Sequence, residues 1–179
     1  MPPQQEESSE QQFRLQRLLP HRLAVRGRWR YASLDGLLMA HGRWFTPSPL
    51  PAEVAPGVPG ACFRESLAWA SEQPPNDTAY VEGFADDMIL GRTAHAWCSR
   101  ADARAIDRTW NPPGVAYTGL PLLPEAAKSF MHDNGTRSVL FASGGLISPT
   151  AENWMRHGIP QGVLADVGIP FPAAFPQPG

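Results

Sequence analysis

Apolar and polar residues follow two different periods along the chain, and each period predicts a type of secondary structure. Between residues 62 and 71, apolar side chains recur every three or four positions, which is typical of an amphipathic helix. Within 78–85 and 93–98 they alternate with small or polar residues, which is typical of strands. The same patterns predict further helices over 34–40, 124–131 and 151–156, and further strands over 104–110, 115–117 and 138–142. We therefore expect an α+β fold in which the helix at 62–71 packs on a small antiparallel sheet.

Residues that start or stop a helix mark several of these boundaries. Ser33 is a favourable N-cap for the first predicted helix, and Thr150 is the expected N-cap of the last one. Prolines and glycines in residues 56–60 cannot continue a helix backwards. The central helix is therefore expected to begin near Cys62.

The two ends of the chain differ in composition from its middle. Residues 1–12 carry few apolar side chains, and we expect them to be disordered. A single domain is expected over 13–165, followed by a proline-rich tail over 166–179. Residues 10–19 have the pattern of a short amphipathic helix, and residues 21–31 have the alternation of an edge strand rich in arginine.

Composition and charge narrow the class of protein. The chain has 179 residues and can bury one core, while its 20 prolines indicate many loops and short elements. Its net charge of −2 gives no electrostatic basis for binding nucleic acid or an acidic membrane surface, so the arginines of 21–31 are best explained as solvated. No apolar run approaches the roughly 18 residues of a membrane span, and no signal peptide is visible. The two cysteines are expected to be reduced, which favours a cytoplasmic location.

Three residues in the central part of the chain can combine into a nucleophile system. Cys62 stands at the start of a predicted helix, His95 on a predicted strand and Asp107 on the next strand. A thiol attacks as its thiolate, which the positive end of a helix dipole and a neighbouring imidazolium both favour. A carboxylate bonded to the second ring nitrogen fixes the histidine tautomer and favours its charged form. The sequence therefore predicts a Cys-His-Asp triad, with the Cys62 amide as a donor to the oxyanion.

The spacing of these residues supports the prediction. His95 and Asp107 are twelve residues apart, which suits two arms of a hairpin whose turn is the polar segment 99–103. Strand alternation places His95 and Trp97 on one face and Cys98 on the other. We therefore expect the second thiol to point away from the site.

Further residues are candidates for contacting a substrate: Trp44, Glu82, Trp97 and Trp110. Trp44 precedes the proline-rich connection to the central helix, where it either lines a groove or packs against the core, and core packing is the favoured interpretation. Glu82 lies in the middle of a predicted strand, where a buried carboxylate needs a partner. It either assists the thiol and the imidazole or, as we favour, has a structural role such as pairing with Arg64 or Arg92.

Several motifs resemble the transglutaminase-like core, a branch of the papain-like thiol enzymes. That pattern has a cysteine at a helix start, His-Ala-Trp on a strand, and an aspartate closely followed by threonine. The corresponding segments are Gly60-Ala61-Cys62, His95-Ala96-Trp97 and Asp107-Arg108-Thr109-Trp110, with additional similarity in Tyr80-Val81-Glu82-Gly83 and Tyr117-Thr118-Gly119-Leu120-Pro121. Arg108 stands where such proteins usually carry proline. The resemblance covers 60–121 and implies acyl-transfer chemistry on a peptide, a protein or a small amide or thioester, without naming one.

Two other interpretations remain open at this stage. The chain could keep a transglutaminase-like fold without turnover and bind a peptide or partner protein, a role that its proline-rich linkers and tryptophans also suit. A zinc site of Cys62, His95 and Cys98 is a weaker alternative, because no Cys-x-x-Cys pair is present and Cys98 is expected to face the other way. No organic cofactor is implied, since no glycine-rich phosphate loop is present.

Overall fold

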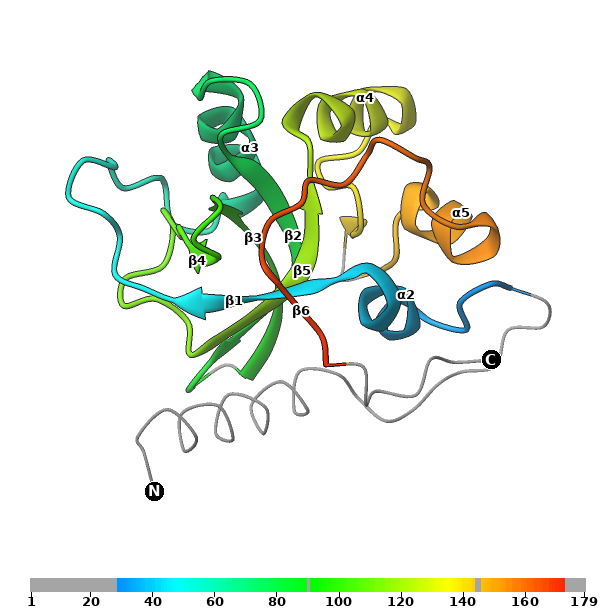
Figure 1. Ribbon diagram of the computed structural model, residues 1–179, viewed down its shortest axis with the longest axis horizontal. Coiled ribbons are helices and arrows are strands. Elements are labelled where there is room, and N and C mark those ends of the chain that lie inside the picture. The colour runs from blue at the N-terminus through cyan, green and yellow to red at the C-terminus, as the bar shows by residue number, and fades with distance from the viewer. Residues whose placement is uncertain (1–28, 90, 144–145, 173–179) are drawn as a thin grey trace.

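The computed structural model describes residues 29–89, 91–143 and 146–172. This part of the chain forms an α+β fold of four helices and a small, mainly antiparallel sheet, as Figure 1 shows. The helices are α2 (Leu34–His41), α3 (Cys62–Glu72), α4 (Pro124–Asn134) and α5 (Pro149–His157). The strands are β1 (Arg43–Pro47), β2 (Ala79–Asp87), β3 (Gly91–Ser99), β4 (Arg104–Ala105), β5 (Ala116–Leu122) and β6 (Ile169–Pro170). The predicted fold class is confirmed at this level.

The sheet curls until its two ends meet. Its strands follow the order β3-β2-β5-β1-β4, with β6 paired to β1. Only the contact between β1 and β4 is parallel, and the other pairs are antiparallel. Directly after β4, Ile106 forms an antiparallel bridge with Cys98 of β3, through backbone hydrogen bonds of 2.8 and 3.1 Å. The sheet therefore encloses an interior side and leaves an exterior side for the helices.

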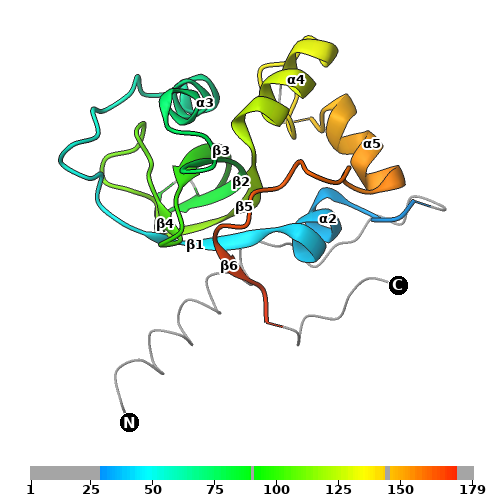
Figure 2. The ribbon, with the colours of Figure 1, turned by 45° about the horizontal axis from the view of Figure 1, so that its top comes forward.

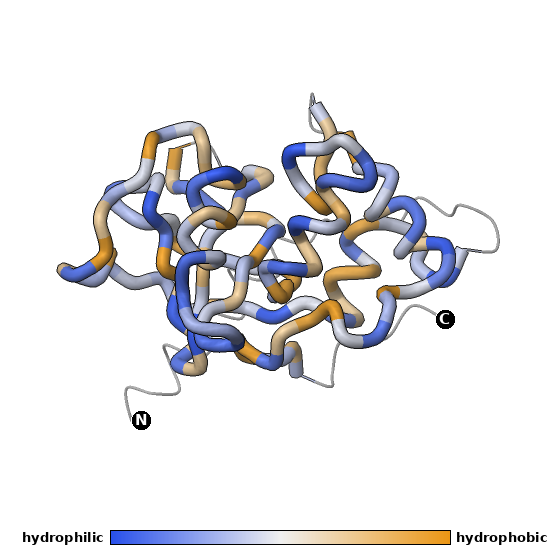
Figure 3. Tube along the Cα trace, turned by 90° about the horizontal axis from the view of Figure 1, so that it is seen from above, coloured by the Kyte–Doolittle hydropathy of each residue, from blue (hydrophilic) through white to orange (hydrophobic). Residues whose placement is uncertain are grey.

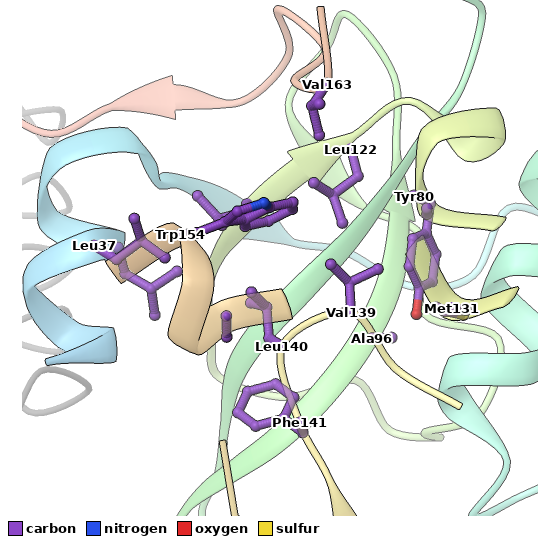
Figure 4. Close-up of a cluster of buried hydrophobic side chains, with 14 of the residues drawn as sticks. Leu37, Tyr80, Ala96, Leu122, Met131, Val139, Leu140, Phe141, Trp154 and Val163 are labelled. Atoms are coloured by element: carbon purple, nitrogen blue, oxygen red, sulfur yellow. The ribbon is translucent and has the colours of Figure 1, made fainter. Parts of the chain in front are cut away.

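The larger apolar cluster lies between the sheet and the helices. Figure 4 shows Trp154 of α5 between Leu37 of α2 and Leu122 of β5. Tyr80 of β2 lies near Met131 of α4 in the same cluster. Trp154, Leu37, Leu122 and Tyr80 are all fully buried. Figure 2 shows α3, α4 and α5 ranged along this side of the sheet. Burial of these large side chains is the main force that holds the helices against the strands.

A second apolar cluster fills the interior of the curled sheet. It contains Phe45, Trp97 and Tyr117, which come from β1, β3 and β5 and pack edge to face with ring centroids 5.1 and 5.6 Å apart. Gly119 makes room for this packing, because a Cβ there would lie 2.9 Å from the Trp97 ring. In Figure 3, where the chain is coloured by hydropathy, apolar and polar stretches alternate along it. The interior cluster fixes the strand that carries the candidate histidine.

Most helix boundaries agree with the sequence-based predictions. Ser33 caps α2 by accepting a hydrogen bond from the Gly36 amide at 3.1 Å, as predicted. α3 begins at Cys62, also as predicted. The predicted cap of the last helix is wrong, since Ser148 rather than Thr150 accepts from the Ala151 amide. Pro149 explains the earlier start, because proline suits the first helical position.

Three strand predictions needed correction. The predicted strand 104–110 ends after β4, because the chain turns sharply around the Asp107 side chain. Residues 138–142 do not form a strand, and only Phe141 makes a bridge, to Ile147. β5 is longer than the predicted 115–117 because it pairs with both β2 and β1.

Several predictions concern residues outside the described part of the chain. They are the disordered start at 1–12, the helix at 10–19 and most of the arginine-rich strand at 21–31. The described end of that last segment, 29–31, is not in a strand. Part of the predicted tail, 166–179, is ordered against the sheet, since β6 pairs with β1. No helix of the described residues is long and apolar enough to cross a membrane.

Candidate active site

Cys62 occupies the first position of α3, at the rim of the curled sheet. The preceding residue, Ala61, gives the helix no side-chain cap, so no side chain there competes for the N–H groups of the first turn. Gly60 has a φ of +79°, a backbone conformation that favours glycine and turns the chain into the helix. Cys62 is only 8% exposed. Its sulfur is therefore held at the positive end of a helix and largely shielded from water.

His95 lies between Cys62 and Asp107. It belongs to β3, faces the interior side of the sheet and is 2% exposed. Its Nε2 is 2.8 Å from Oδ2 of Asp107, and the Cys62 thiol lies near enough to its ring to raise its pKa. Burial lowers the pKa of His95, but the hydrogen bonds with Asp107 and Cys62 outweigh it and raise the pKa from 6.5 to about 9. The imidazole is thus held in its charged form near neutral pH.

Asp107 is the best-connected polar group of the site. Its Oδ1 accepts hydrogen bonds from the Thr109 amide, the Thr109 hydroxyl and the Trp110 amide, at 3.0 to 3.2 Å. Its Oδ2 accepts from Tyr117 at 2.9 Å as well as from His95. Burial raises the pKa of Asp107, but these contacts, His95 first among them, bring it below the usual value. Asp107 therefore stays ionised and orients the imidazole.

Trp110 and Tyr117 complete the surroundings of the histidine. The Trp110 ring stacks on the His95 ring with a centroid distance of 4.2 Å and an interplanar angle of 28°. The Tyr117 hydroxyl donates to Asp107 and accepts from the Gly114 amide at 2.7 Å. Burial raises the pKa of Tyr117 well above its ordinary value, so its hydroxyl remains a donor. Tyr117 was missed as a site residue, and its position in the Tyr-x-Gly-Leu-Pro motif was the available signal.

Arg108 ties the aspartate loop to the cysteine helix. Its guanidinium donates to the carbonyl oxygens of Ala55, at 2.8 Å, and of Glu65, at 3.3 Å. Its own carbonyl accepts from the Gly57 amide at 2.8 Å. The segment before α3, the helix itself and the Asp107 loop are therefore linked through one residue. Sequence reasoning noted Arg108 only as a departure from a pattern.

Glu82 does not lie at the site. It is fully buried on the opposite face of its strand, where its two oxygens accept hydrogen bonds from Tyr80, Ser138, Val139 and Leu140 at 2.6 to 2.8 Å. Burial raises the pKa of Glu82 even though these donors oppose the effect. The favoured structural role is confirmed, but the predicted arginine partner is wrong, since hydroxyls and backbone amides occupy the carboxylate. Arg92 pairs with Asp35 and Arg64 with Glu65.

Of the three candidate tryptophans, only Trp110 is placed to meet a substrate. Trp97 is fully buried in the interior cluster, so the prediction that it contacts substrate is wrong. Trp44 neighbours Phe45 on β1, and successive residues of a strand face opposite sides. Phe45 shares the interior side with His95, so Trp44, for which core packing was the favoured interpretation, faces away from the triad.

Cys98 faces α3 on the exterior side of the sheet, as strand alternation predicted. Its thiol donates to the Ser66 carbonyl oxygen at 3.1 Å, and it is fully buried. Burial raises the pKa of Cys98 far above its ordinary value, which makes this thiol unreactive. Within the described ranges, no group of three or more His, Cys, Asp or Glu side chains could hold a metal ion.

A depression of about 360 Å³ opens beside the stacked pair of His95 and Trp110. Trp110 and Arg108 form one wall, and Pro56 and Pro59 of the segment before α3 form another. A ligand there would lie between the indole that covers the imidazole and the chain that leads into the cysteine. Its lining includes Arg108 and Thr109, which directly follow Asp107.

Comparisons with known proteins do not assign the chain to a family. No protein-family model, no curated protein and no solved structure matches it. Conclusions about function therefore depend on the geometry described above.

Proposed function

We propose that this protein catalyses acyl transfer through a thiol nucleophile, with Cys62 as nucleophile, His95 as acid and base, and Asp107 as the orienting carboxylate. One observation carries the proposal: a buried histidine pairs with a buried carboxylate 2.8 Å away, and a thiol at a helix N-terminus lies near enough to raise the pKa of the same histidine. This is the relation of nucleophile, base and orienting group that activates a thiol.

The order of the groups defines each step. With Nε2 of His95 bonded to Asp107, Nδ1 is left for the thiol and takes its proton. The thiolate sulfur of Cys62 attacks the carbonyl carbon, and the π electrons of the carbonyl move to its oxygen. The oxyanion collapses, the bond to the leaving amine breaks, and Nδ1–H of His95 protonates that amine. An acyl-thioester on Cys62 remains.

Water completes the cycle by hydrolysis. His95 removes a proton from the water as its oxygen attacks the thioester carbon. The carbon–sulfur bond then breaks, a carboxylic acid leaves, and Cys62 returns to the thiolate paired with the protonated His95. An amine in place of the water would give a new amide and make the reaction a transamidation.

The arrangement of elements supports a transglutaminase-like core as part of the proposal. α3 packs on the exterior of a curled sheet and carries the cysteine at its start, while β3 carries the histidine. The substrate would be a peptide, a protein or a small amide or thioester that enters beside Trp110. Such chemistry needs a reduced thiol, which suits a cytoplasmic location, and both cysteines are free.

A partner-binding scaffold without turnover is the second candidate. The observation that favours it is the burial of the nucleophile pair, with Cys62 8% and His95 2% exposed. A scaffold needs no activated thiol, whereas an enzyme does. Reactivity of Cys62 therefore separates the two candidates.

The test is the rate at which iodoacetamide alkylates Cys62 near neutral pH, followed by mass spectrometry with Cys98→Ser as background. The enzyme requires alkylation well above the rate of an unstructured cysteine peptide and roughly 100-fold slower alkylation in His95→Ala. Incubation with thioester and amide substrates would then add the acyl mass to Cys62. An alkylation rate that His95→Ala leaves unchanged, in a folded protein, would favour the scaffold.

A further inference from the structure

A groove of about 730 Å³ runs between α3 and α4 and shares no lining residue with the Trp110 depression. Figure 1 shows the two helices as neighbours above the sheet. The groove begins at Gly60 and Ala61, which directly precede Cys62, and reaches Ser71 near the end of α3. Its volume lies within the usual range of roughly 300–1,000 Å³ for ligand pockets.

The groove has an apolar floor and a positively charged rim. Phe63 and Leu67 of α3 and Met131 of α4 supply apolar side chains. Arg64, Lys128 and Arg137 add cations from α3, α4 and the loop after α4, and the described residues that line the groove include no Asp or Glu. Because the whole chain has a net charge of −2, this local excess of positive charge does not follow from composition. It marks a surface that is complementary to an anionic ligand.

The three cations are not fully engaged by the protein itself. Arg64 pairs with Glu65 and Lys128 with Glu125, in exposed ion pairs of the kind that contribute little to stability. Arg137 makes no hydrogen bond or ion pair with any described residue, and it is exposed. A bound anion could therefore recruit all three side chains without breaking a buried contact.

From these features we infer that the α3–α4 groove binds an acidic peptide segment with apolar residues at alternate positions, and that this segment belongs to the acyl substrate. Only the second part of this inference, that the segment belongs to the acyl substrate, rests on the proposed function. It goes beyond that function by naming the class of substrate and the surface that selects it.

The length and layout of the groove favour a peptide. The part of α3 that borders it is roughly 16 Å long at about 1.5 Å per residue, which matches about five residues of extended chain at about 3.3 Å each. In an extended peptide, alternate side chains point to opposite sides. Apolar side chains would then reach Phe63, Leu67 and Met131 while acidic ones face the cations. A fatty acid would present one charge to three separated cations.

The position of the groove joins recognition to chemistry. A chain that leaves the groove at Gly60 and Ala61 passes over the start of α3, where the Cys62 sulfur lies. It can then continue toward the depression beside Trp110. The acidic segment would thus hold the substrate on one side of the scissile carbonyl.

The first test measures binding to the full-length Cys62→Ser protein, which cannot form the acyl-enzyme. Three five-residue probes alternate leucine with glutamate, glutamine or lysine, are blocked at both ends, and carry one neutral dye for fluorescence anisotropy. The glutamate probe should bind at least roughly tenfold more tightly than the glutamine probe, and the lysine probe most weakly. Binding of the glutamate probe should weaken as salt rises above about 0.1 M.

Charge reversal locates the binding site. Arg137→Glu should weaken binding of the glutamate probe by roughly tenfold or more. Arg104→Glu is the matched control, because Arg104 is exposed on β4 and does not line the groove. Four results would each overturn the inference. The first two are equal binding of the three probes and no binding of the glutamate probe. The others are stronger competition by decanoate than by peptide, and unchanged binding of the glutamate probe in a folded Arg137→Glu protein.

The wild-type protein then separates this inference from the proposed function. The glutamate probe with a C-terminal thioester should acylate Cys62 faster than its lysine counterpart. Selective binding without acylation would refute the proposed chemistry and leave the groove assignment standing. Acylation at equal rates with both probes would refute the groove assignment and leave the chemistry standing.

Discussion

Asp107→Asn tests the site with the smallest change of shape. Oδ1 of Asp107 accepts three hydrogen bonds from Thr109 and Trp110, two of them from backbone amides, whereas Oδ2 faces His95 and Tyr117. We expect asparagine to keep its oxygen toward the three loop donors, because its amide nitrogen cannot accept from them. The amide nitrogen then faces Nε2 of His95, which must accept a hydrogen bond instead of donating one.

The pKa of His95 sets the size of the effect. Burial lowers this pKa, and hydrogen bonds with Asp107 and Cys62 raise it from 6.5 to about 9. Without the charge of Asp107, only the contact with Cys62 opposes burial, so the pKa of His95 should fall back toward 6.5. The difference of about 2.5 pH units corresponds to roughly 3 kcal/mol of stabilisation of the imidazolium. The ratio of the thiolate–imidazolium pair to the neutral thiol–imidazole pair should therefore fall by more than roughly 100-fold.

Two measurements follow this change. The pH titration of the His95 ring by NMR should move from about 9 to an ordinary or lower pKa in Asp107→Asn. The rate of Cys62 alkylation near neutral pH should fall by roughly 100-fold. Asp102→Asn is the matched control, since Asp102 is an exposed aspartate in the turn before β4. A folded Asp107→Asn protein that alkylates within about threefold of wild type would refute the reasoning, because the charge would then not act through His95.

Three further predictions concern stability. Glu82→Gln should lower the free energy of unfolding by about 2–4 kcal/mol, measured by urea titration, because the amide nitrogen of glutamine would face two buried donors. An unchanged urea midpoint would contradict the structural role of the Glu82 carboxylate. Tyr117→Phe should cost about 1–3 kcal/mol in the same assay, since the buried Gly114 amide loses its acceptor and Asp107 a donor, and a cost near zero would argue against it. The folded-state pKa of His95, about 9, exceeds its unfolded value of 6.5, so its contribution is complete below pH 6.5 and is lost as the pH rises through 9. Thermal unfolding should show this decline in wild type and a flatter profile over that range in His95→Gln; parallel profiles would contradict it.

Local sequence patterns were sufficient for the elements that carry the cysteine and the histidine. The proline- and glycine-rich segment 56–60 fixed the start of α3, and strict alternation identified β2 and β3. The segments 104–110 and 138–142 were predicted wrongly as strands. In both, a buried carboxylate gathers backbone amides that a strand would have used, and that carboxylate is Asp107 in the first and Glu82 in the second. The donors to Asp107 are only two and three residues ahead, so this competition is local, whereas Glu82 lies on a distant strand and its effect on 138–142 depends on the tertiary fold.

Local sequence patterns also predicted part of the candidate site. The face of a strand residue follows from alternation, which separated His95 from Cys98 correctly. Alternation does not say whether a face is enclosed, and the curl of the sheet buries Trp97 behind His95. Asp107 lies in the loop after β4 and Tyr117 on β5, and these two strands do not pair with each other, so no hairpin spacing could bring the residues together.

Arg108 illustrates how a departure from a pattern can be part of the design of a site. Proline at this position would offer no side-chain donors and no N–H. Arg108 instead binds the carbonyl oxygens of Ala55 and Glu65 and so fastens the Asp107 loop to α3. The distance between the cysteine and the histidine depends on how α3 sits against β3, and the orientation of the histidine depends on the Asp107 loop. A residue that joins the helix to this loop therefore acts on both, which explains how a half-buried arginine outside the triad can matter to it.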